Sequence, residues 1–207
     1  MKQALRNLLP RRRDGPAFLA LLGAYWLAAV VGLQWTVVPG VGTAVWPASG
    51  IALAALLLGG ERLWLAIFLG RLLAAAAVAS PQPWWADMWI ALATAIGALG
   101  PALLIRRSGD FDPRLGNLRD AARLVLIGGV GGAIFSGPLA TLGLWASGTP
   151  PERLLHIMDT WCFGFGVGVV VVAPAIMTWW DRSLRALSAT GWMHLVLCLA
   201  GVALVAN

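Results

Sequence analysis

Charged residues are scarce in this chain of 207 residues, and their scarcity excludes most soluble proteins. Only 12% of the residues are Asp, Glu, Lys or Arg, whereas soluble domains carry about 25%. Hydrophobic residues make up 59% of the chain, and the mean hydropathy is +0.80. We therefore expect an integral membrane protein whose main partner is the lipid bilayer.

Cysteine and histidine are also rare, with two of each. Cys162 and Cys198 both fall in apolar segments, where a free thiol behaves as a small hydrophobic side chain, so the pattern does not indicate a disulfide framework. His156, Asp159 and Cys162 are spaced three residues apart, which places them on one helical face. One His with one Cys and one carboxylate is a weak metal signature. We expect no metal centre and no cofactor.

Acidic residues are fewer than basic ones, which leaves a formal net charge of +6. The Lys and Arg residues stand singly or in short clusters between apolar runs, so they predict membrane topology and not a nucleic-acid partner. If the N-terminus is cytoplasmic, every Lys and Arg except Arg71 and Arg153 falls in a cytoplasmic segment. The positive-inside rule therefore predicts a cytoplasmic N-terminus.

Long apolar runs predict the fold class: an all-α, polytopic transmembrane helical bundle of about seven spans, since a bilayer takes roughly 20 apolar residues per helix. The predicted spans cover residues 16–38, 45–59, 63–80, 84–105, 124–146, 154–180 and 192–207. Residues 1–207 are expected to form a single integral membrane domain. The last predicted span stops at Asn207 without a polar flank, which favours a chain trimmed from a longer protein.

The second predicted span opens with an unusual segment at Trp46. Pro47 has no N–H and a helical φ, so it suits the first turn of a helix that ends at Gly59. Trp46 is then expected at the membrane interface. Ser49 and Gly50 lie in a first turn whose N–H groups have no partners within the helix. The segment is either an ordinary helix start or the rim of a ligand site on the outer side.

Arg71 is a charge in the middle of the third predicted span. It follows Arg62 by nine residues, which places it ~13 Å deep in a ~30 Å apolar core. A charge at this depth needs a partner or water. Asp159, six residues after Arg153, is expected ~9 Å below the outer surface and is the candidate partner. The two alternatives are a structural ion pair and a ligand or transport site.

Glycines recur every four residues in the fifth and sixth predicted spans. Gly128 and Gly132 have this spacing, and Gly164 and Gly168 repeat it. Small residues at this period let helices approach closely, so spans five and six are expected to touch. The alternative is that the glycines of residues 128–132, with Gly137-Pro138, break the helix and form a binding cavity, as in discontinuous transporter helices.

Two motifs carry a resemblance to a known family. The first reads W-P-A-S-G-I-A-L-A-A-L-L-L-G-G-E-R-L-W over residues 46–64, followed by I-F-L-G over 67–70. The second reads W-C-F-G-F-G-V-G-V-V-V-V-A-P over 161–174. Together they resemble the bacterial membrane-associated sensor domain of the first type, a MASE-family input domain. This chain differs from the family's pattern at Phe165, where Asp is common, and at Arg71, where a small residue is usual.

The resemblance implies an input domain of about eight helices in the bacterial plasma membrane, joined to a cytoplasmic histidine kinase or diguanylate cyclase. Seven spans would then place the end of this chain before an eighth helix and an output domain. We expect a non-enzymatic signal-input domain that binds a small ligand or a partner membrane protein and forms a homodimer through its output domain. The expected ligand-binding residues are Trp46, Pro47, Ser49, Gly50, Arg71, Asp159 and Trp161.

Two other functions remain open. The first is a small-molecule transporter, or the substrate-binding membrane subunit of one, with an anion site near Arg71. The second is an intramembrane hydrolase that pairs Ser49 with His156. Ser at a helix start is normally a cap, so we expect no catalytic residue.

Overall fold

The computed structural model describes residues 14–34 and 45–180, and all the regular elements in these two ranges are helical. This confirms the all-α class. The seventh predicted span and the basic N-terminal residues that favoured a cytoplasmic N-terminus lie outside the described residues. The seven-span count and the orientation therefore stay predictions.

The described helices closely follow the predicted apolar runs. They are α2 (Gly15–Gln34), α3 (Pro47–Gly59), the 3-10 turn η2 (Glu61–Leu63), α4 (Trp64–Ala77), α5 (Trp84–Arg107), α6 (Leu118–Arg123), the π-helical segment η3 (Leu124–Gly131), α7 (Gly132–Ala146) and α8 (Pro151–Trp180). Four stretches are long and apolar enough to cross a membrane: α2, α5, the continuous run from α6 through α7, and α8. Helix α3 is apolar but shorter.

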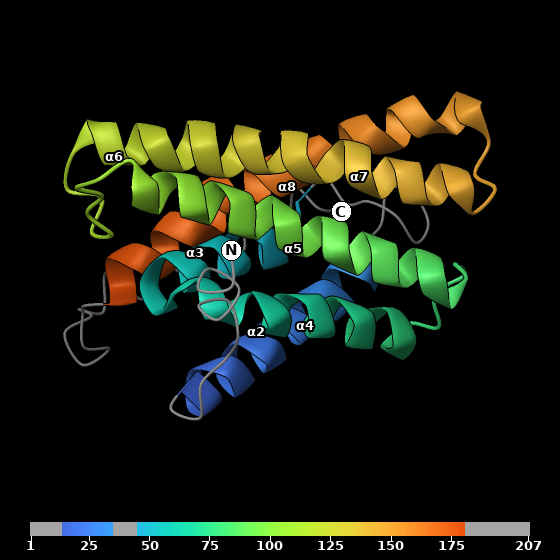
Figure 1. Ribbon diagram of the computed structural model, residues 1–207, viewed down its shortest axis with the longest axis horizontal. Coiled ribbons are helices and arrows are strands. Elements are labelled where there is room, and N and C mark those ends of the chain that lie inside the picture. Colours follow the sequence, from blue (N-terminus) through green and yellow to red (C-terminus); the bar gives the residue numbers. More distant parts are fainter. Residues whose placement is uncertain (1–13, 35–44, 181–207) are drawn as a thin grey trace, which may run out of the picture.

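Helix α3 lies at the centre of the bundle. Helices α5, α7 and α8 run along the long axis of the molecule, α2 and α4 lie on the side away from α7, and the short α3 lies between the two groups (Figure 1). Its main neighbour is α8, and it also packs against α2 and α5. Ala48, Ala52 and Leu56 of α3 are completely buried. A helix that is apolar on all sides is expected in such a central position.

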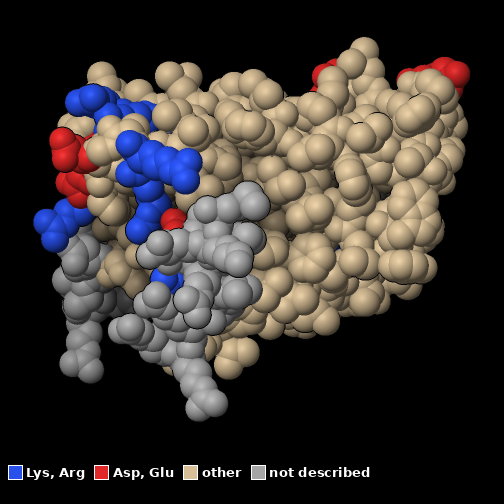
Figure 2. All heavy atoms as spheres, viewed as in Figure 1, with Lys and Arg blue, Asp and Glu red and all other residues tan. Residues whose placement is uncertain are grey.

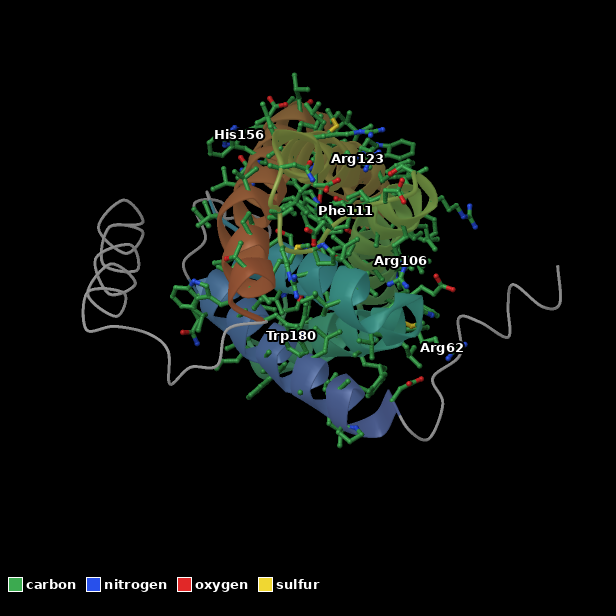
Figure 3. All side chains as sticks on the ribbon, turned by 90° about the vertical axis from the view of Figure 1, so that its left-hand side faces the viewer. Arg62, Arg106, Phe111, Arg123, His156 and Trp180 are labelled. Carbon is green, nitrogen blue, oxygen red and sulfur yellow. The ribbon has the colours of Figure 1, made fainter. Side chains whose placement is uncertain are left out.

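In the face shown in Figure 2, Lys and Arg side chains gather at one end of the bundle, which we call the basic end, whereas Asp and Glu are visible at both ends. Arg62, Arg106 and Arg123 lie there, with Phe111 between the last two (Figure 3). Arg106 also holds the last turn of α3, because its Nη1 donates to the carbonyl oxygens of Leu56 and Leu57, both at 3.2 Å. The other end of the bundle, where α5 and α8 begin, is called the opposite end.

Helices α7 and α8 pack closely through small residues, as the glycine spacing predicted. A Cβ added at Gly132 would lie 2.5 Å from the Phe165 ring, and one added at Gly137 would lie 2.5 Å from Cys162 Sγ. The alternative that glycines break this span was wrong. Residues 124–131 remain helical in a wider π form, so their backbone N–H groups keep partners inside the helix. Such π segments often occur at functional sites.

Candidate functional site

The first turn of α3 lies against the middle of α8. The backbone N–H of Trp46 donates to the carbonyl oxygen of Gly164 at 2.9 Å. Gly164 follows Pro151, the first residue of α8, by thirteen positions, which places it ~20 Å along that helix. The prediction of Trp46 at the membrane interface was therefore wrong. Its indole ring instead packs on α2, where a Cβ added at Gly32 would lie 2.8 Å from the ring.

Ser49 is completely buried in this contact. Its Oγ lies 2.7 Å from the carbonyl oxygen of Trp46 and 2.8 Å from that of Phe165, and can donate to either. The expectation of an outward-facing turn at Ser49 and Gly50 was wrong, because both residues are covered by α8. The hydrolase pair is not formed either. His156 is exposed and precedes Phe165 by nine residues, a rise of ~13 Å.

Two glycines let the backbones of α3 and α8 meet. A Cβ added at Gly50 would collide with the carbonyl oxygen of Gly168 and lie 2.6 Å from Cβ of Val172. A Cβ added at Gly168 would collide with the carbonyl oxygen of Trp46. Gly168, expected to face the fifth span, thus makes room for α3. We call the segments 46–50 and 164–168 the α3–α8 junction.

Arg71 lies on α4 with only 4% of its surface exposed. Its Nε and Nη1 are buried and have no hydrogen-bond partner among the residues that the structure describes. The groups that act on it electrostatically are Tyr25 of α2 and Asp87 of α5. The Tyr25 hydroxyl is also buried without a hydrogen bond, although the Trp46 side chain lies beside it. Tyr25, Arg71 and Asp87 form what we call the Arg71 cluster.

The predicted pair of Arg71 with Asp159 was wrong. Helix α4 packs against α2 and α5, whereas α8 packs against α3, α7 and η3. Asp159 is exposed on α8. The reasoning from the sequence compared only depths in the membrane, and two residues at similar depth can face different sides of a bundle.

Trp161 faces α7, because its indole N–H donates to Ser136 Oγ at 3.1 Å. Of the expected ligand-binding residues, the structure brings Trp46, Pro47, Ser49 and Gly50 together and places Asp159 and Trp161 elsewhere on α8. Trp46 connects the junction to the Arg71 cluster through Tyr25.

Sequence reasoning missed Tyr25 and Asp87. Tyr25 is the single tyrosine of the chain, and it stands in an otherwise apolar run. Asp87 is a carboxylate inside the first turn of the long apolar helix α5. An isolated polar or ionisable residue within a membrane span indicates a functional site, so the sequence pattern alone could have identified both residues.

Comparisons with known proteins identify the family. Neither the curated proteins nor the solved structures compared with this chain gave a match. The family model of MASE1, the membrane-associated sensor 1 domain, matches residues 17–206. MASE1 is a family of membrane sensor input domains, in agreement with the apolar helices and the two motifs around Trp46 and Trp161. The chain belongs to the MASE1 family.

Proposed function

We propose that this domain is the signal-input part of a bacterial plasma-membrane signalling protein. It binds a small ligand or a membrane partner, and it passes a helix rearrangement to a cytoplasmic histidine kinase or diguanylate cyclase. The observation that carries the proposal is the α3–α8 junction. A short helix begins inside the bundle and is joined to the middle of a helix of 30 residues that connects the two ends.

The junction is suited to relay a displacement. A stimulus must favour one of two packings of the bundle, because a ligand that binds both equally shifts nothing. At Gly50 and Gly168 the backbones of α3 and α8 approach directly, and the side chains beside them are the short ones of Ser49 and Val172. A movement of α3 along its axis therefore moves α8 as well. The neighbouring π segment η3 packs on α8 and supplies a stretch that can return to α-helical form.

In this proposal the basic end faces the cytoplasm, in keeping with the positive-inside rule. The test of orientation uses single cysteines in a background with Cys162→Ala and Cys198→Ala. Arg114→Cys at the basic end is expected to resist a membrane-impermeant maleimide in intact cells, and Gly148→Cys is expected to react. The reverse labelling pattern contradicts the orientation.

The signalling role is tested with residues 1–207 joined to a diguanylate cyclase reporter through an added eighth transmembrane helix, which returns the chain to the cytoplasm. Gly168→Ala, which forces the two backbones apart, is expected to change the basal output at least several-fold at equal protein level. Gly166→Ala is the matched control, because an added Cβ there has no atom within 4 Å. Equal output from both variants contradicts a relay through the junction.

A transporter is the second candidate, and one observation favours it. Helix α3 begins inside the bundle, as the discontinuous helices of secondary transporters do. Uptake of labelled solutes into proteoliposomes separates the two functions. The sensor proposal predicts none, whereas concentrative uptake that Arg71→Gln abolishes supports the transporter.

A further inference from the structure

The Arg71 cluster contains opposite charges on neighbouring helices that do not bond to each other. Arg71 and Asp87 are both more than nine-tenths buried, with exposures of 4% and 8%. They act on each other electrostatically. No ion pair within 4.0 Å joins Arg71 and Asp87, whereas Arg123 and Asp120 form one at 3.1 Å. Each charge of the cluster therefore keeps free hydrogen-bonding capacity.

Arg71 is the donor side of the cluster. Its Nε and Nη1 have no acceptor in the described part of the chain, and the Tyr25 hydroxyl next to it has no partner. Burying such groups unpaired is costly. The planar guanidinium presents parallel N–H groups whose best partner is a carboxylate. The Tyr25 hydroxyl offers a further donor to the same anion.

Asp87 is the acceptor side and opens to a cleft. Its Oδ1 accepts a hydrogen bond from Ser80 Oγ at 3.0 Å, while the structure shows no hydrogen bond to Oδ2 within the described residues. Asp87 lines a cleft of about 470 Å³ between α4 and α5 near the opposite end. This volume is in the usual range of small-molecule sites, about 300–1,000 Å³.

The rest of the cleft suits a small polar molecule with a short apolar side chain. Ser80 and Gln82 supply polar groups, Trp84 supplies an aromatic face, and Leu72 and Ala75 of α4 form an apolar wall. Leu72 adjoins Arg71 in sequence, and Ala75 lies one turn beyond it on α4. An aromatic face beside a carboxylate favours a cationic group. The cleft thus holds a cation-binding carboxylate, while the Arg71 guanidinium lies buried behind the α4 wall and does not line the cleft.

We propose that the Arg71 cluster binds a small α-amino acid as its zwitterion. The ammonium group bonds to Asp87 and the carboxylate bonds to Arg71 and Tyr25. A turn of the Arg71 side chain toward Asp87 brings it to the ligand. Because Tyr25 contacts Trp46, occupation of the cluster acts on the first residue of the α3–α8 junction. The proposal rests on the signal-input function and specifies its stimulus.

The test measures thermal unfolding of the purified domain in detergent by tryptophan fluorescence with three probes. L-alanine carries both charges, propionate lacks the ammonium group, and ethylamine lacks the carboxylate. We expect L-alanine to raise the melting midpoint with saturation, and each one-charge probe to give less than half of that rise at equal concentration. Equal rises with propionate and L-alanine, or no rise with any probe, overturn the proposal.

Variants locate the effect in the cluster. Arg71→Gln and Asp87→Asn are each expected to abolish the L-alanine shift, while Leu73→Ala, a half-exposed position on α4, keeps it. If either loss-of-charge variant fails to fold, Arg71→Lys and Asp87→Glu keep the charges and are expected to weaken L-alanine binding at least tenfold. An unchanged L-alanine shift in the folded cluster variants overturns the proposal.

The cyclase fusion separates this proposal from the signal-input function. L-alanine binding without a change in output supports the amino-acid site and contradicts the signal-input role. A junction variant that changes output while no probe binds overturns the amino-acid site alone.

Discussion

The α3–α8 junction and the Arg71 cluster are both buried, but they treat polar groups in opposite ways. At the junction, the Trp46 N–H and the Ser49 hydroxyl both have partners on α8. In the cluster, donors on Arg71 and Tyr25 have none. A satisfied contact transmits a displacement because it resists deformation. Polar groups without partners can gain free energy by bonding to a ligand. The junction is therefore suited to transmit a movement, and the Arg71 cluster is suited to bind the stimulus.

The largest effect on stability is expected at Gly168, because the α3–α8 junction is the tighter of the two regions. Gly168→Ala places a Cβ against the backbone oxygen of Trp46, which cannot rotate away. We expect the free energy of unfolding to fall by about 3 kcal/mol, the upper part of the usual range for overpacking. Thermal or denaturant unfolding in detergent measures it.

Gly166→Ala is the matched control on the same helix. An added Cβ there meets nothing within 4 Å, and the gain in helix propensity is about 1 kcal/mol or less. If the two variants unfold alike, the α3–α8 junction is not a tight contact.

The Arg71 cluster is expected to respond in the opposite direction. Arg71→Met removes a buried charge whose donors lack partners, and Met fills a similar volume. Combined with Asp87→Leu, so that no uncompensated buried charge is left, this change is expected to raise the free energy of unfolding by about 2 kcal/mol, since apolar replacement of both members of a buried charge pair often stabilises by 1–4 kcal/mol.

The measurement is the same unfolding experiment without added amino acid, with Leu73→Met as the control on the exposed face of α4. A clear loss of stability would show that Arg71 is bonded in the membrane protein, and it would remove the contrast between the two regions.

The smallest effect is expected at Ser49. Ser49→Ala removes the side-chain hydrogen bond to the carbonyl oxygen of Phe165 but keeps the close packing. Hydrogen bonds between membrane helices contribute about 0.6 kcal/mol on average, so a loss of that order is expected. Thr178→Ala is the control, because its hydroxyl bonds within its own helix to the carbonyl oxygen of Pro174. If Ser49→Ala lowers the free energy of unfolding more than Gly168→Ala does, the junction is stabilised mainly by this hydrogen bond and not by the backbone contact.

Reasoning from the sequence recovered the helices well and the contacts between them poorly. The start of α3 at Pro47 follows from the chemistry of proline, and the contact of α7 with α8 follows from the glycine spacing. The partner of Gly168 was assigned to the wrong helix, because a small residue permits close approach without specifying which helix approaches. Arg71 was recognised as a buried charge, but its neighbours Tyr25 and Asp87 were not.

The sequence by itself determined that this is an all-α membrane protein with the motifs of a sensor input domain, because hydropathy, charge and residue spacing are properties of the chain. Only the tertiary structure decided that α3 begins beside the middle of α8 and that Arg71 lies between Tyr25 and Asp87. In a bilayer the lipid tails are as apolar as the helices, so the hydrophobic effect does not select which helices pack together. Their arrangement depends on backbone approach at a few glycines and on polar groups from different helices, which no single segment contains.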